Sequence, residues 1–394
     1  MKRPRSSIVD LLVLAGHGTG QAAFGDYCRA FKNTRFITPG HLLGQAEELT
    51  ALIDKDCSAG YLGLIIDRWS EGWSLEDFLK LLRSRRQAAA ADEPAQASFD
   101  LVLLSRDPVE QLLSLANTRL LWWAFKVSGF NNSDALASDF YETSSSMADF
   151  LNKLVQPGFF YDTQFSVVKL LPLLAPLSRQ TIVLDIDDIR PGRDEETMTR
   201  LGQKLFNDPS AWAGRSPGSN TRGLTNRFFS CIEPLRLNFD ARLFTFSPRP
   251  EKWFNLGQAP GVFYFAYDPE EIEWEGGEFS GRLALVSGQA DLLRFNAALS
   301  EALKKMLDDG DKKILRRYSR AINGKYKKAL AVFDSVKLLP ETLLEHLLKN
   351  YKLYQAVSQI ILEQRQALEQ AGSTNAKTWK MAEAVRGTDY TGRH

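Results

Sequence analysis

The segment Leu14-Ala-Gly-His-Gly-Thr-Gly20 is the first place in the chain where residue types and spacing favour chemistry. Glycines let backbone amides converge in a tight turn, and the helical spacing that follows adds the positive end of a helix. Such a turn is typical of a phosphate or sulfate cradle, shaped by Gly16, Gly18 and Gly20 with Thr19 as a hydroxyl donor. The segment matches neither the Walker pattern nor the G-x-G-x-x-G dinucleotide pattern. Strand-to-helix turns of parallel sheets also use glycine, so an ordinary structural turn remains an alternative.

Arg106 and Ser114, eight residues apart, form a second candidate anion-binding pair. Arg106 ends an apolar run, and Asp107, Pro108 and Glu110 then suit the cap, the first turn and the capping-box position of a helix. A guanidinium offers phosphate a planar fork of donors, and a hydroxyl two helical turns further along can reach the same anion. A well-capped helix start explains the three residues between them, but neither the arginine nor the serine.

Taken together, these features resemble the sulfotransferase superfamily. In that family a strand-terminal Arg and a helical Ser eight residues later hold the 3′-phosphate of 3′-phosphoadenosine 5′-phosphosulfate, and the loop after the first strand holds its phosphosulfate. The run 181–188 followed by Arg190-Pro-Gly-Arg-Asp-Glu-Glu looks like the family's third element, and Tyr161-Asp-Thr-Gln-Phe165 is also similar. The resemblance covers roughly residues 8 to 250 and rests on order and spacing. It implies a transfer of sulfate to a hydroxyl of a glycan or small molecule, a bacterial surface polysaccharide by analogy, without a metal ion.

One departure from the family concerns the transfer step. The family places Lys or Arg where this chain has Gly16, and that cation meets the charge that builds on the leaving phosphate. Three explanations remain open: His17 is the donor, a basic residue of the 213–227 loop or of the basic helical stretch at 312–328 reaches in, or the protein binds a nucleotide without transferring a group. The last is a different class of function, a non-catalytic nucleotide-binding or interaction protein. A different transferase or kinase that uses the loop for another phosphate is a third possibility.

The resemblance also implies a general base and a further basic residue at the 3′-phosphate. His41, in Thr-Pro-Gly-His-Leu-Leu, best matches the place of the base, although a loop histidine can equally be structural. Arg215 and Arg222, in Arg-Ser-Pro-Gly-Ser-Asn-Thr-Arg, match the place of the basic residue, although a solvated loop also explains them.

Short apolar runs that alternate with helical stretches must position these residues. The pattern predicts an α/β fold with a parallel central sheet flanked by helices, and with a helical C-terminal region. The expected strands are 8–15, 35–38, 61–66, 100–105 and 181–185, and expected helices include 21–32, 164–174, 195–206 and 341–370. We expect a domain over 1–288 with a mobile insertion at about 84–98, a helical region over 289–371, and a poorly ordered tail over 372–394.

Composition limits the partners. With 49 basic and 48 acidic side chains the net charge is +1, so no global field favours nucleic acid. The three cysteines, Cys28, Cys57 and Cys231, have no metal-type spacing, which argues against a zinc site or a disulfide framework and favours the cytoplasm. The run from Ile8 to Ala15 is too short for a membrane helix, so we expect no integral membrane segment. The apolar stripe of the last helix can pair with a second copy or pack on its own domain.

Overall fold

The structure is a computed structural model, and it divides into two compact units. The first comprises residues 1–116, 144–221 and 338–394, and the second comprises 117–143 and 222–337. No helix in the described part of the chain is both long and apolar enough to cross a membrane. The structure describes residues 9–28, 30–37, 45, 47–49, 51, 61–70, 72–80, 99–129, 141–190, 192–212, 235–239, 242–246, 263–266, 282–285, 325, 328–373 and 375–387.

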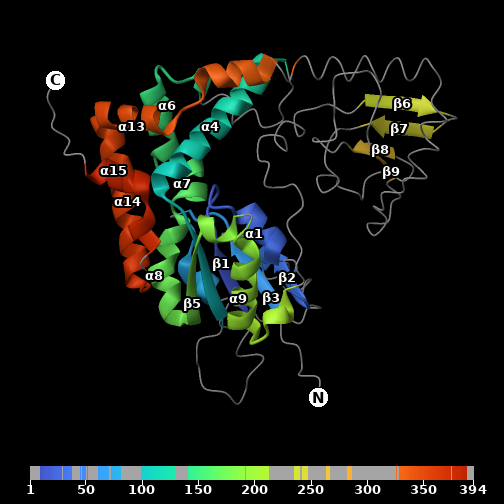
Figure 1. Cartoon of the computed structure of the whole chain (residues 1–394), viewed down its shortest axis with the longest axis vertical. Helices are drawn as coiled ribbons and strands as arrows, with labels where there is room; N and C mark the ends of the chain where they lie inside the picture. Colours follow the sequence, from blue (N-terminus) through green and yellow to red (C-terminus); the bar gives the residue numbers. More distant parts are fainter. Residues whose placement is uncertain are drawn as a thin grey trace. The chain divides into compact units, whose positions relative to one another are not determined.

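A five-stranded sheet in the order β2-β3-β1-β4-β5 forms the centre of the first unit (Figure 1). All four strand pairings are parallel, which confirms the predicted α/β fold. The strands are β1 (Leu11–Leu14), β2 (Thr34–Ile37), β3 (Tyr61–Ile66), β4 (Phe99–Ser105) and β5 (Ser178–Asp185). β1 is the middle strand and all of its residues are buried, as expected for a strand covered on both faces.

One face of the sheet is covered by α1 (Gln21–Cys28) and α9 (Asp194–Phe206), the latter followed by the short turn η5 (Pro209–Ala211). Phe24 and Tyr27 of α1 and Met198 and Leu201 of α9 join the strand side chains in one buried core. The Tyr27 hydroxyl donates a hydrogen bond to Asp194 Oδ2 at 2.7 Å, which ties the two helices together. Between β5 and α9 the chain makes the turn η4 (Ile186–Ile189).

The other face meets a broken helical segment that precedes β5. It consists of α7 (Phe159–Gln164), η2 (Val167–Leu170), α8 (Leu171–Leu174) and η3 (Ala175–Leu177). The expected single helix over 164–174 is therefore wrong. Ser166 interrupts it, because its hydroxyl donates to the carbonyls of Trp69 and Asp162 instead of facing solvent.

The C-terminal helices belong to the first unit, so the expected division at residue 288 differs from the one observed. The expected helix over 341–370 is two helices, α13 (Pro340–Lys349) and α14 (Tyr351–Gln370), because the Asn350 side chain caps α14. The apolar stripe of α14 packs within its own unit, against α6 (Met147–Val155), η2 and α8.

The expectation of a poorly ordered tail is wrong for residues 380–386. After η7 (Asn375–Thr378), this stretch forms α15 (Lys380–Arg386), whose Ala382 and Val385 are fully buried. The insertion at about 84–98 lies outside the described residues.

The second unit contains a four-stranded sheet in the order β6-β7-β8-β9. Its strands are β6 (Leu235–Phe239), β7 (Arg242–Phe246), β8 (Phe263–Ala266) and β9 (Arg282–Leu285). The long helix α4 (Pro108–Val127) begins in the first unit, and its residues from 117 onward are assigned to the second. All candidate site residues that the structure describes lie in the first unit.

Candidate functional site

The glycine-rich loop follows β1 at the carboxyl edge of the sheet and leads into α1. Gly18 and Gly20 have φ values of +83° and +81°, a conformation that side chains disfavour, so both glycines are required by the backbone. The hydroxyl of Thr19 donates to the carbonyl of Gly16 at 2.7 Å, and the Thr19 amide reaches the same oxygen at 3.2 Å. Thr19 therefore stabilises the turn itself. Within the described residues, the amides of Gly18 and Gly20 have no hydrogen-bond partner.

Backbone packing explains why no cation stands at position 16. A Cβ atom at Gly16 would lie 2.7 Å from the carbonyl oxygen of Gln164, the last residue of α7. The amide of His17 also donates to the carbonyl of Thr163 at 2.6 Å, which holds α7 against the loop. Because the obstacle is backbone, a Lys or Arg side chain does not fit at position 16 in this arrangement.

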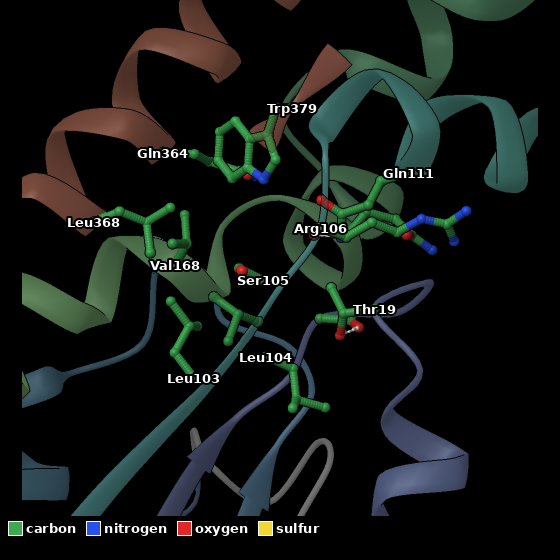
Figure 2. A pocket seen from close by; sticks show the side chains of 13 residues that line it. Thr19, Leu103, Leu104, Ser105, Arg106, Gln111, Val168, Gln364, Leu368 and Trp379 are labelled. Atoms are coloured by element: carbon green, nitrogen blue, oxygen red, sulfur yellow. Dashed lines mark hydrogen bonds between the residues drawn. The ribbon is translucent and has the colours of Figure 1, made fainter. Parts of the chain in front are cut away.

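Arg106 meets the loop from the neighbouring strand. It directly follows β4, which pairs with β1, so its side chain starts beside the glycine-rich turn. Its Nη1 donates to the carbonyl of Gly18 at 2.7 Å, and its Nε lies 3.3 Å from Glu110 Oε2. Figure 2 shows the arginine extending beside Thr19. The structure thus brings the predicted cation to the predicted loop, with its charge partly balanced by Glu110.

The face of α4 that meets the loop also carries Ser114. Gln111 on this face donates to the carbonyls of Gln164 at 3.2 Å and of His17 at 3.4 Å. Ser114 lies three residues after Gln111 and four after Glu110, and residues at these spacings are neighbours on one helix face. Ser114 therefore lies about one turn further along the face of α4 that carries Glu110 and Gln111, and it is partly exposed.

His17 contacts Asp67, a residue that the sequence interpretation missed. His17 Nε2 lies 3.3 Å from Asp67 Oδ2, and Gln21 Nε2 lies 3.5 Å from the same oxygen. Asp67 directly follows β3, the other neighbour of β1, and parallel strands bring such residues together at their carboxyl ends. A charged residue directly after a buried strand is the signal that would have identified it.

The C-terminal helices approach the carboxyl end of β4, and Figure 2 shows the Arg106 side chain extending away from Gln364, Leu368 and Trp379. Trp379 and two residues of α14 line a cavity of about 20 Å³, which has room for about one water molecule. No nucleotide fits there unless this C-terminal segment moves. The lining includes Gly16, Thr19, Ser105, Arg106, Gln111, Gln164, Gln364, Leu368 and Trp379.

Asp107 fixes this arrangement. Its Oδ1 accepts from the amide of Val109 at 2.9 Å, which caps α4 as the sequence predicts. Its Oδ2 accepts from the amides of Met381 and Ala382 at 2.9 and 3.0 Å, and these two residues lie in the first turn of α15. Burial is the main cause that raises the pKa of this carboxyl above its ordinary value. One buried carboxylate therefore caps two helices.

Three predicted site residues, His41, Arg215 and Arg222, lie outside the described residues. Within the described ranges, no group of three or more His, Cys, Asp or Glu side chains is arranged to hold a metal ion. Comparisons with protein-family models, with curated proteins and with solved structures find no match. Function is therefore argued from the geometry of the site.

Proposed function

We propose that the carboxyl edge of the parallel sheet binds 3′-phosphoadenosine 5′-phosphosulfate, and that the protein transfers its sulfuryl group to a hydroxyl of a glycan or small molecule. The observation that carries the proposal is the contact of Arg106 with Gly18. A strand-terminal cation held against a glycine-rich turn that precedes a helix is a suitable arrangement for an anion.

The remaining groups at this edge support the same chemistry. The unpartnered amides of Gly18 and Gly20, at the start of α1, can donate to phosphate or sulfate oxygens. Ser114 extends the Arg106 side of the site along α4. Sulfuryl transfer has a loose transition state with charge on the leaving group, so positioned donors are the main contribution that a protein makes.

A second candidate function is nucleotide binding without transfer. It is favoured by the backbone of Gln164, which excludes a lysine or arginine from position 16. A protein that lacks the leaving-group cation can keep nucleotide affinity and lose the rate of transfer.

The first experiment is a calorimetric titration of the full chain with adenosine 3′,5′-bisphosphate. Replacing Arg106 with Ala should weaken binding at least tenfold, about 1.4 kcal/mol, and Arg106→Lys should weaken it less because the charge is kept. Lys349→Ala is the matched control, since it removes a cation that is exposed on α13. Its dissociation constant should equal that of the wild type.

The second experiment measures transfer of radiolabelled sulfate from 3′-phosphoadenosine 5′-phosphosulfate to p-nitrophenol and to glucose. Transfer that depends on Arg106 supports the enzyme. Binding of the bisphosphate without transfer supports the second candidate. A folded wild-type chain that binds no bisphosphate refutes both.

A further inference from the structure

We propose that His17 is the base that takes the proton of the acceptor hydroxyl, and that Asp67 is the residue that positions it. This inference rests on the proposed transfer and adds the proton path to it. The starting observation is the 3.3 Å contact between Nε2 of His17, in the glycine-rich loop, and Oδ2 of Asp67, which directly follows β3.

The contact determines which ring nitrogen can accept a proton. An ionised carboxylate has no proton to give, so Nε2 of His17 must carry the hydrogen that joins it to Asp67. In the neutral imidazole, Nδ1 is then the unprotonated nitrogen. Within the described residues, Nδ1 has no hydrogen-bond partner. His17 therefore presents a proton acceptor that its neighbours do not use.

The exposure of the two side chains indicates which of them is the base and which positions it. The side chain of His17 is 39% exposed, whereas that of Asp67 is 10% exposed. The histidine can therefore reach a substrate, and the aspartate is held behind it. Gln21 on α1 supports the carboxylate from a second side, with its Nε2 at 3.5 Å from Oδ2. An exposed base oriented by a buried carboxylate is the arrangement that activates a hydroxyl in many transferases and hydrolases.

Two buried acceptor atoms indicate the class of acceptor. Asp67 Oδ1 and Gln21 Oε1 are buried and have no donor among the described residues. A buried acceptor without a donor costs free energy, which a ligand with O–H groups recovers if the two side chains turn to meet it. Both atoms belong to side chains joined through Asp67 Oδ2, so a ligand with several hydroxyl groups suits them best. A saccharide has this character and a simple phenol does not.

The step balances without a further reactant. The acceptor oxygen forms a bond to sulfur while the bond from sulfur to the phosphate oxygen breaks. The leaving phosphate keeps the electron pair of that bond. The hydroxyl proton moves to His17 Nδ1, and Asp67 stabilises the imidazolium that results. The proton then leaves to solvent from the exposed ring.

The test measures transfer of radiolabelled sulfate to glucose and to p-nitrophenol, with imidazole as a chemical rescue. His17→Ala should lower the rate constant about 100-fold or more, while adenosine 3′,5′-bisphosphate still binds within twofold of wild type. Added imidazole should restore part of the rate. Asp67→Ala should lower kcat more than it changes KM, and imidazole should not restore it, because the base is still present but misplaced.

The double variant His17→Ala/Asp67→Ala separates positioning from folding. If Asp67 positions the base, imidazole should rescue the double variant much less than His17→Ala alone. His346→Ala and Asp334→Ala are the matched controls, since they remove the same side-chain types from α13 and from an exposed site, and both should keep the wild-type rate.

Three results with the variants overturn the inference. They are full transfer by His17→Ala, no rescue of His17→Ala by imidazole, and equal rescue of the single and double variants. A wild-type chain that binds the bisphosphate but transfers to neither acceptor also overturns it, while leaving the binding site of the proposed function in place. If the wild-type chain does not bind adenosine 3′,5′-bisphosphate, the proposed function itself is refuted.

Discussion

Replacement of Asp107 by Ala tests how the C-terminal segment is held against the sheet. The change removes two caps at once, because one carboxylate oxygen serves α4 and the other serves α15. A single helix cap typically contributes about 1 kcal/mol, so we expect Asp107→Ala to lower the free energy of unfolding by about 2 kcal/mol. In the variant, the amides of Val109, Met381 and Ala382 would lose the acceptor that the Asp107 carboxylate provides in the wild type.

Ser146→Ala is the matched control for this estimate. Ser146 caps only α6, through one hydrogen bond from the amide of Asp149 at 3.1 Å, and should cost about 1 kcal/mol. Urea denaturation of the three proteins gives the free energies. Amide hydrogen exchange at Met381 and Ala382 should accelerate in Asp107→Ala and not in Ser146→Ala. If the two variants lose the same stability, or if exchange in α15 is unchanged, the double cap does not stabilise the protein.

The same carboxyl predicts a pH effect with a defined sign. Burial raises the pKa of Asp107 in the folded chain above its ordinary value of 3.8, so the folded state binds the proton more tightly than the unfolded state. This contribution to stability is fully present below pH 3.8 and is lost as the pH rises through the raised value. Asp107→Asn cannot titrate, so the stability of the wild type relative to this variant should fall over that window. If the free energy of unfolding of the wild type relative to Asp107→Asn rises with pH, the pKa of Asp107 is not raised by folding.

Other predictions concern the loop and the helices around the core. Gly16→Ala should cost about 1–3 kcal/mol in urea denaturation, because its Cβ would lie 2.7 Å from the Gln164 carbonyl, and an unchanged midpoint would refute that packing. Tyr27→Phe should cost about 1 kcal/mol through loss of the bond to Asp194, and its thermal midpoint should fall accordingly. Asn207, which ends α9 with φ of +53°, should accept Gly at little cost while Ala destabilises by about 1 kcal/mol, as measured in the same denaturation series.

The strands of the sheet could be predicted because their signal is local. β3 matches the predicted range, and the other strands differ only at their ends. Strands buried on both faces of a parallel sheet are short continuous apolar runs, and such runs can be recognised in the sequence without knowledge of the fold. The helix start at Pro108 was predictable for the same reason, since Asp107 caps a turn that it directly precedes.

The site depends on contacts between segments that are distant in sequence. The loop and Arg106 could each be named from the sequence, but their contact requires β1 and β4 to be neighbours, which no local pattern reveals. Asp67 was missed because its role depends on His17, which is 50 residues away in sequence. The missing cation at position 16 was visible, whereas its cause, a carbonyl of α7, was not.

The hydrogen bond between Asp107 and Met381 can form only late in the synthesis of the chain. These residues are 274 positions apart, although the last strand of the central sheet ends at residue 185. At about 5–20 residues per second, the ribosome takes roughly 14–55 seconds to travel from one to the other. A nascent chain therefore has all five strands well before α14, which packs against α6, η2 and α8, has been synthesised. During that interval, apolar surface destined for α14 and α15 is open to chaperones or to other chains.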